Sequence, residues 1–166
     1  MPITAEILKN KIEAEMATVS DARVTAHIRR MLVEPHAVLR DWEYGEPGRR
    51  YLCWMVLKDG RSGGEIAYCE FGFGPRSPWG LVSSGPEHRG MGEDSGWFAT
   101  FLDAFFESMA CVALPIWRVF RDEPDGSRTP MTDEGAWEPT WSYVYDLRRR
   151  DPTSRYNCGH SIKHGP

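Results

Sequence analysis

The loop spanning residues 74–96 contains many of the side chains that could recognise a partner or carry out chemistry. Its charged, aromatic and hydroxyl residues include Arg76, Trp79, Ser83, Ser84, Glu87, His88, Arg89, Glu93 and Asp94. Trp and Arg are enriched among the residues that dominate binding energy at protein interfaces. Long loops on a rigid scaffold often carry function, so we expect an interaction surface here rather than a plain connection. The expected partner-binding residues are Arg76, Trp79, Glu87 and His88.

The same region offers an alternative, in which the loop covers a small-ligand or catalytic pocket. General acid–base catalysis needs titratable groups such as carboxylates and imidazoles, and a pocket between residues 74–94 and the preceding sheet would bring such groups together. The residues of this alternative pocket are Glu70, Arg76, Trp79 and His88. Sequence alone gives no distance between a base and the group that would orient it, so an enzyme or small-ligand-binding protein remains the second hypothesis.

Motifs for metals and cofactors are present only in incomplete form. Residues 72–75 read Gly-Phe-Gly-Pro, but a dinucleotide fingerprint needs a third glycine and a helix that follows directly. Cys158, His160 and His164 supply three zinc-ligand types, but no second ligand pair stands nearby. Residues 122–126 depart from a calcium-binding loop because of their proline and the lack of a closing glutamate. We therefore expect no metal site and no cofactor.

The charge balance argues against nucleic acid as a partner. The 166 residues include 20 Lys and Arg against 24 Asp and Glu, which gives a net charge of −4. An acidic chain repels the phosphate backbone on average, and the short run Arg148–Arg150 is more typical of a solvated helix face. Aromatic residues make up 12% of the chain, and we assign most of them to the core.

Several features favour a cytoplasmic protein. No apolar run approaches the roughly 18 residues that a membrane-spanning helix needs. Residues 1–16 include five charged side chains, so they lack the apolar segment of a secretion signal. Cys53, Cys69, Cys111 and Cys158 stand at isolated positions. In a reducing compartment such cysteines are most simply buried small apolar residues.

The N-terminal third predicts a pair of helices. Residues 4–17 have a narrow apolar stripe, and Thr4 is suited to capping the start of this helix. A second helix is expected from Ser20 to about residue 34, because apolar residues recur there at helical spacing. Pro35 would end it, since proline disfavours helical geometry at the residue before it.

The region after the helices predicts strands. In residues 51–57 both alternating sets of side chains are apolar, which indicates a strand covered on both faces or one whose second face is hidden by a helix or a partner. Glycine-rich turns then return the chain as a partner strand over residues 66–73. This hairpin would place Cys53 near Cys69 or Glu70. Further strands are expected at 37–44, 79–82, 116–121 and 141–147.

Residues 95–109 predict an amphipathic helix that covers the sheet. Its large apolar residues recur at intervals of three and four, which is the pattern of a buried helix face. They are Trp97, Phe98, Phe101, Leu102, Phe105, Phe106 and Met109. Residues 128–139 are expected to form an irregular loop, and the segment after Arg150 lacks periodicity, as a mobile tail does.

These elements predict an α+β protein. Residues 1–150 would form a single domain whose mainly antiparallel sheet, of about five or six strands, is covered by the N-terminal helical pair and the central helix. Residues 151–166 would form a C-terminal tail. The favoured function is that of a small, non-enzymatic cytoplasmic protein of bacterial type that binds another protein. An immunity protein or inhibitor that masks a toxin is its most concrete form, because an acidic surface suits a basic active site.

Overall fold

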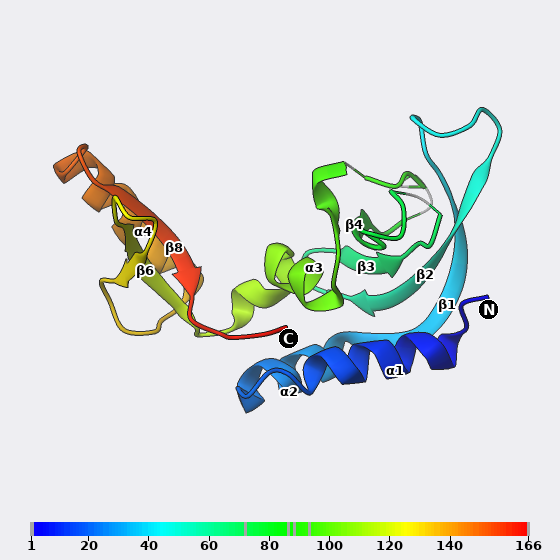
Figure 1. The fold of residues 1–166 in the computed structure, drawn as a ribbon, viewed down its shortest axis with the longest axis horizontal. Helices are drawn as coiled ribbons and strands as arrows, with labels where there is room; N and C mark the ends of the chain where they lie inside the picture. Colours follow the sequence, from blue (N-terminus) through cyan, green and yellow to red (C-terminus); the bar gives the residue numbers. More distant parts are fainter. Residues whose placement is uncertain (1, 72, 86, 88, 93, 166) are drawn as a thin grey trace. The chain divides into compact units, whose positions relative to one another are not determined.

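The structure is a computed structural model that describes residues 2–71, 73–85, 87, 89–92 and 94–165. Its residues group into two compact units, of which the first comprises Met1–Cys111 with His164–Pro166 and the second Val112–Lys163. Each unit combines helices with an antiparallel sheet, so the predicted α+β class is confirmed. Figure 1 draws most of the first unit in blue to green and the second in yellow to red.

The first unit begins with two helices, α1 (Ala5–Met16) and α2 (Ala22–Met31). Thr4 caps α1 as predicted, since its hydroxyl accepts a hydrogen bond of 3.3 Å from the amide of Ile7. The cap of α2 is Asp21 rather than Ser20, and its carboxylate accepts a hydrogen bond of 2.9 Å from the amide of Arg23. The predicted end of this helix near residue 34 was wrong, because an extended conformation begins at Leu32.

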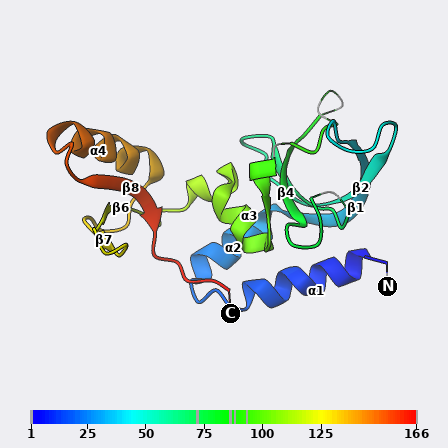
Figure 2. The ribbon, with the colours of Figure 1, turned by 45° about the horizontal axis from the view of Figure 1, so that its top comes forward.

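Five antiparallel strands follow, each paired with the next along the chain. They are β1 (Leu32–Asp41), β2 (Arg50–Lys58), β3 (Gly64–Tyr68), β4 (Trp79–Ser83) and β5 (Trp97–Phe98). The sheet curves strongly, as Figure 2 shows. A bridge between Asp41 and Gly90 joins the end of β1 to the segment after β4. The predicted hairpin of β2 and β3 is confirmed, although β3 ends five residues earlier than expected, at Tyr68.

The predicted helix over residues 95–109 is confirmed only in its middle. Residues Asp94–Gly96 form a 3₁₀ turn (η1), β5 follows, and α3 covers only Phe101–Glu107 before a second 3₁₀ turn, η2 (Met109–Ala113). Thr100 sets the start of α3, because its hydroxyl accepts a hydrogen bond of 3.0 Å from the amide of Asp103. Phe101 and Phe105 are fully buried as expected, whereas Met109 is 56% exposed.

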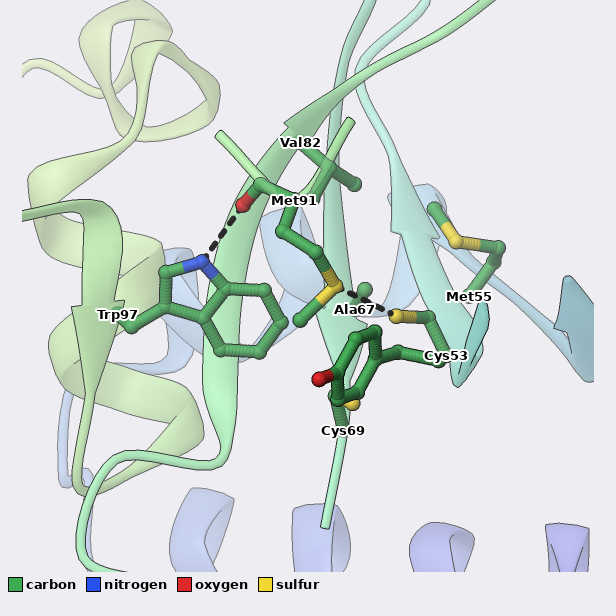
Figure 3. Close-up of a cluster of buried hydrophobic side chains, with 8 residues drawn as sticks. Cys53, Met55, Ala67, Cys69, Val82, Met91 and Trp97 are labelled. Atoms are coloured by element: carbon green, nitrogen blue, oxygen red, sulfur yellow. Dashed lines mark hydrogen bonds between the residues drawn. The ribbon is translucent and has the colours of Figure 1, made fainter. Parts of the chain in front are cut away.

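The concave side of the first sheet encloses an aromatic and sulfur-rich core, part of which Figure 3 shows. Its buried members are Tyr51, Cys53, Met55, Ala67, Cys69, Val82, Met91 and Trp97. Cys53 and Cys69 belong to this one cluster, and the register that pairs Trp54 with Tyr68 places them opposite each other, so the predicted proximity of these two cysteines is confirmed. The interaction with the Cys69 thiol, together with burial, holds the pKa of Cys53 well above its usual value.

An arginine is also buried beside this core. The Arg40 side chain is 5% exposed and its guanidinium donates hydrogen bonds to the backbone oxygens of Gly90, at 3.0 Å, and Ser83, at 3.1 Å. The carboxylate of Glu65 lies 3.6 Å from the same group. Arg40 therefore ties β1 to β4 and to the segment after it, which fixes the curvature of the sheet.

The second unit contains a three-stranded antiparallel sheet and one helix. Its elements are β6 (Trp117–Asp122), β7 (Arg128–Pro130), α4 (Trp137–Arg150) and β8 (Arg155–His160), and β6 is the central strand. Val119, Val144 and Tyr156 form its buried core. β8 falls within the segment that the sequence marked as a tail, and neither β7 nor β8 was predicted.

The strand predicted at 141–147 was wrong, because these residues lie within α4. Trp137, Trp141 and Tyr145 recur every four residues and their rings contact one another in sequence along the helix. Pro139 is tolerated because it occupies the first helical turn, where no intrahelical donor is lost. No helix in the described part of the chain is both long and apolar enough to cross a membrane.

Candidate protein-binding surface

The outer face of the first sheet exposes apolar side chains because β2 is apolar on both of its faces. Cys53 and Met55 point inward and are buried, as strand alternation requires. On the outer face, Val56 is completely buried and shares a hollow with Ile12 of α1. Toward the other end of the strand, Trp54 is only half-buried and Leu52 is 47% exposed. The helix therefore covers one end of this face and leaves the other in contact with solvent.

Neighbouring strands extend this uncovered area. Leu39 of β1 lies directly opposite Leu52 and is also 47% exposed. Phe71, just after β3, is 67% exposed. Leu39, Leu52, Trp54 and Phe71 together form what we call the outer patch. Large apolar side chains that are exposed singly are ordinary, but adjacent ones mark sites of interaction.

The outer patch borders a shallow hollow of about 360 Å³. It is lined by Pro2, Ile3, Leu52, Trp54, Tyr68, Glu70 and Phe71. Among these described lining residues only Glu70 is charged, and the others are apolar or aromatic. The hollow can thus receive an apolar side chain whose flank carries a positive charge.

The first unit, which bears the outer patch, carries a net negative charge. At its edge, the carboxylate of Asp41 and the guanidinium of Arg50 face each other across the strands at 3.2 Å and neutralise one another. The second unit carries eight basic and eight acidic side chains, so the whole net charge of −4 belongs to the first unit. The field around this unit therefore favours a basic partner over an acidic one.

The structure distributes the sequence-predicted residues over different environments. Trp79 is 2% exposed and its ring contacts those of Tyr68, at 4.9 Å between centroids, and Phe101, at 5.5 Å. It is thus part of the core and offers no surface to a partner in this conformation. Arg76 and Glu87 are exposed, and His88 lies outside the described residues.

Glu70, a member of the alternative ligand pocket, lines the hollow of the outer patch with neighbours that the sequence analysis did not group with it. Leu39, Leu52 and Phe71 were missed as surface residues, because apolar side chains in strands are assigned to a core by default. One signal did point to them. The double apolar alternation of residues 51–57 left open a face hidden by a helix or a partner, and only the structure shows which end the helix covers.

Comparison with known proteins adds no functional assignment: no family model, no curated protein and no solved structure matches the chain.

Proposed function

We propose that this chain acts by binding another protein through the outer patch. The observation that carries the proposal is the uncovered end of the outer sheet face, where Leu39 and Leu52 are paired across the strands and both remain about half exposed. A cluster of this kind gains free energy when a partner covers it, because burying apolar surface is favourable.

The partner we propose is an unlike protein that presents apolar side chains flanked by Lys or Arg. The apolar part would occupy the hollow of the outer patch, and a basic flank would lie near Glu70. The net charge of −4 on the first unit would accelerate the encounter with such a basic surface. A toxin whose active surface is basic fits this chemistry, so the immunity-protein form of the function rests on the same patch.

The size of the expected effect follows from the exposed fractions. Full burial of a Leu or Phe side chain is worth about 1.5–3 kcal/mol, and 67% of Phe71 remains available for burial. Covering Phe71 would therefore contribute about 1–2 kcal/mol, which corresponds to a change in Kd of roughly 5- to 30-fold. Leu52 would contribute somewhat less because 47% of it is exposed.

The test compares variants of the patch with a matched surface variant. The partner is first recovered with the full chain as bait, and the purified partner is then titrated calorimetrically. Phe71→Ser and Leu52→Ser should each weaken binding by the amounts above. Tyr44→Ser is the control, since Tyr44 is 78% exposed between β1 and β2 but is not part of the patch.

Three results would contradict the proposal. Patch variants that bind as tightly as the wild type would show that the partner binds elsewhere. A dimer of the chain that dissociates on Leu52→Ser would assign the patch to a second copy. A small molecule in the hollow, competing with no protein, would favour the alternative of a ligand-binding protein.

A further inference from the structure

The core of the first sheet concentrates sulfur to an unusual degree. Of its eight buried residues, Cys53, Met55, Cys69 and Met91 carry a sulfur atom. Each of the four is 2% exposed or less. Cys and Met side chains pack well in cores, and four of them in one cluster also bring together the ligand types that soft metal ions prefer.

Two of these sulfurs are in direct contact, and a third belongs to a residue that lies opposite them across the sheet. The thiol of Cys53 donates to the thioether sulfur of Met91 at 3.4 Å. Cys69 directly follows β3, and the antiparallel register that pairs Trp54 with Tyr68 places it opposite Cys53. Figure 3 shows the Met91 side chain reaching from its loop toward Cys53, with Cys69 below them in the same cluster. Strand β2 and the residue that follows β3 thus hold the two thiols, while a loop supplies the thioether.

We propose that Cys53, Cys69 and Met91 form a binding site for a soft monovalent metal ion, Cu(I). Thiolate and thioether ligands favour Cu(I) over harder ions, and three sulfurs suit a trigonal site. With metal–sulfur bonds near 2.3 Å, such a site has sulfur atoms about 4 Å apart, somewhat further than the present contact. The unbranched Met91 side chain can supply that adjustment through its rotatable bonds.

The backbone of the third ligand is fixed in advance. The indole nitrogen of Trp97 donates a hydrogen bond of 2.7 Å to the backbone oxygen of Met91. This contact anchors the backbone of the loop at the proposed site, which is the support that a preorganised site requires. Val82 and Ala67 pack around the cluster and exclude water.

Charge and access are also compatible with the site. Binding replaces two thiol protons with one Cu(I) ion, so the two protons are released and the site gains one net negative charge. The guanidinium of Arg40 enters the same core, where it lies 3.9 Å from the sulfur of Met55, and its positive charge acts on Cys53. Met91 also lines a surface hollow of about 730 Å³ with Gly90 and Gly92, which provides a route to the site.

The spacing of residues in the sequence could not have indicated this site. Cys53 and Cys69 are 16 positions apart, and the third ligand is a methionine, which no standard motif includes. In the described part of the chain no three Cys, His, Asp or Glu residues come together as metal ligands. The site is visible only when thioethers are counted as ligands. It lies on the inner face of β2 and is independent of the outer patch.

The experiment is an anaerobic competition for Cu(I) between the reduced full-length protein and the chromophoric chelator bicinchoninate. We expect transfer of one ion per chain and an X-ray absorption spectrum with a sulfur-only shell. Met91→Leu, which nearly conserves volume, should weaken Cu(I) binding about tenfold or more. Cys53→Ala and Cys69→Ala should abolish the transfer. Circular dichroism checks that each variant folds. If a cysteine variant does not fold, the Cu(I) affinity of Met91→Leu decides the test.

Cys111 provides the matched control. It is a buried cysteine whose thiol donates to the backbone oxygens of Phe106 and Ser108, so Cys111→Ala should leave Cu(I) binding unchanged. Cys158→Ser should do the same. The proposal is overturned if the wild type takes no Cu(I) from the chelator, if either control variant loses it, if Met91→Leu retains wild-type affinity, or if nitrogen ligands dominate the spectrum.

Discussion

Replacing Arg40 with Met removes the charge that closes the curved sheet, and we expect it to destabilise the first unit strongly. The substitution deprives the backbone oxygens of Gly90 and Ser83 of their donors and leaves Glu65, whose side chain is 14% exposed, without its nearest cation. Breaking a buried pair in this way typically costs about 3–5 kcal/mol, because an uncompensated charge remains. Lys58, at 4.0 Å from Glu65, offsets only part of this loss since its own side chain is 55% exposed.

The matched control is Arg50→Met. Arg50 forms a comparable pair with Asp41 at 3.2 Å, but the two side chains are 45% and 60% exposed. A pair in water is worth less than about 1 kcal/mol, so this variant should unfold almost as the wild type does. A third variant, Arg40→Met with Glu65→Leu, should recover much of the loss, because apolar groups of similar volume replace a buried pair with little penalty.

The assay is amide hydrogen exchange at β2 and β3, since their slowest amides report the opening of the first unit alone. Denaturant titration of the same variants gives the free energy of unfolding independently. If Arg40→Met lowers the free energy of unfolding by less than about 1 kcal/mol, or by no more than Arg50→Met does, then burial does not strengthen the Arg40–Glu65 pair. The account of how the sheet is closed would then be refuted.

Three further predictions concern separate parts of the chain. Phe101→Ala should lower the free energy of unfolding by about 3–5 kcal/mol in denaturant titration, because Phe101 is fully buried against Trp79. Hydrogen bonds from Thr153, Ser154 and Tyr156 hold the pKa of Asp151 below its ordinary value of 3.8. The stability that these bonds contribute is therefore complete above pH 3.8 and is lost as the pH falls through the lowered pKa. An NMR titration in which the carboxyl of Asp151 protonates at 3.8 or above would contradict this. Arg76→Ala should change the free energy of unfolding by no more than about 0.5 kcal/mol in a thermal melt, because Arg76 is exposed. A larger loss of stability would give this residue a structural role.

The parts of the fold that the sequence predicted well are those where one physical effect dominates. The strand at 51–57 and its return were found because β-branched, aromatic and sulfur-bearing residues alternate between glycine-rich turns. The cap at Thr4 was found from residue type alone, since a hydroxyl before an apolar run is a local signal. Local patterns of this kind require no knowledge of distant contacts.

The errors arose where two periodicities fit the same residues. Residues 141–147 alternate in a way that suits a strand, but their aromatic rings also recur every four residues, and packing on Val119 selected the helix. Residues 95–109 have helical spacing throughout, but the cap at Thr100 and the pairing of Trp97 with Gly80 divide them. In both regions tertiary contacts decided between local alternatives.

The candidate site was only partly predictable for a related reason. The sequence indicated that one face of the 51–57 strand needs a cover, but which part of that face α1 covers is a property of the assembled unit. Trp79 looked like a recognition residue because of its type, whereas its position opposite Tyr68 in the sheet makes it a core residue. Residue type identifies what a side chain can do, and only burial determines what it contacts.

The most direct test of the proposed function is photocrosslinking from the outer patch. A photoreactive phenylalanine analogue is placed at position 71 in one chain and at position 44 in another, and both are irradiated in extract of the native cell. We expect one protein to be crosslinked from position 71 but not from position 44, and excess wild-type chain to suppress it while the Leu52→Ser variant does not. Equal crosslinking from both positions, or equal suppression by the wild type and Leu52→Ser, would contradict the account.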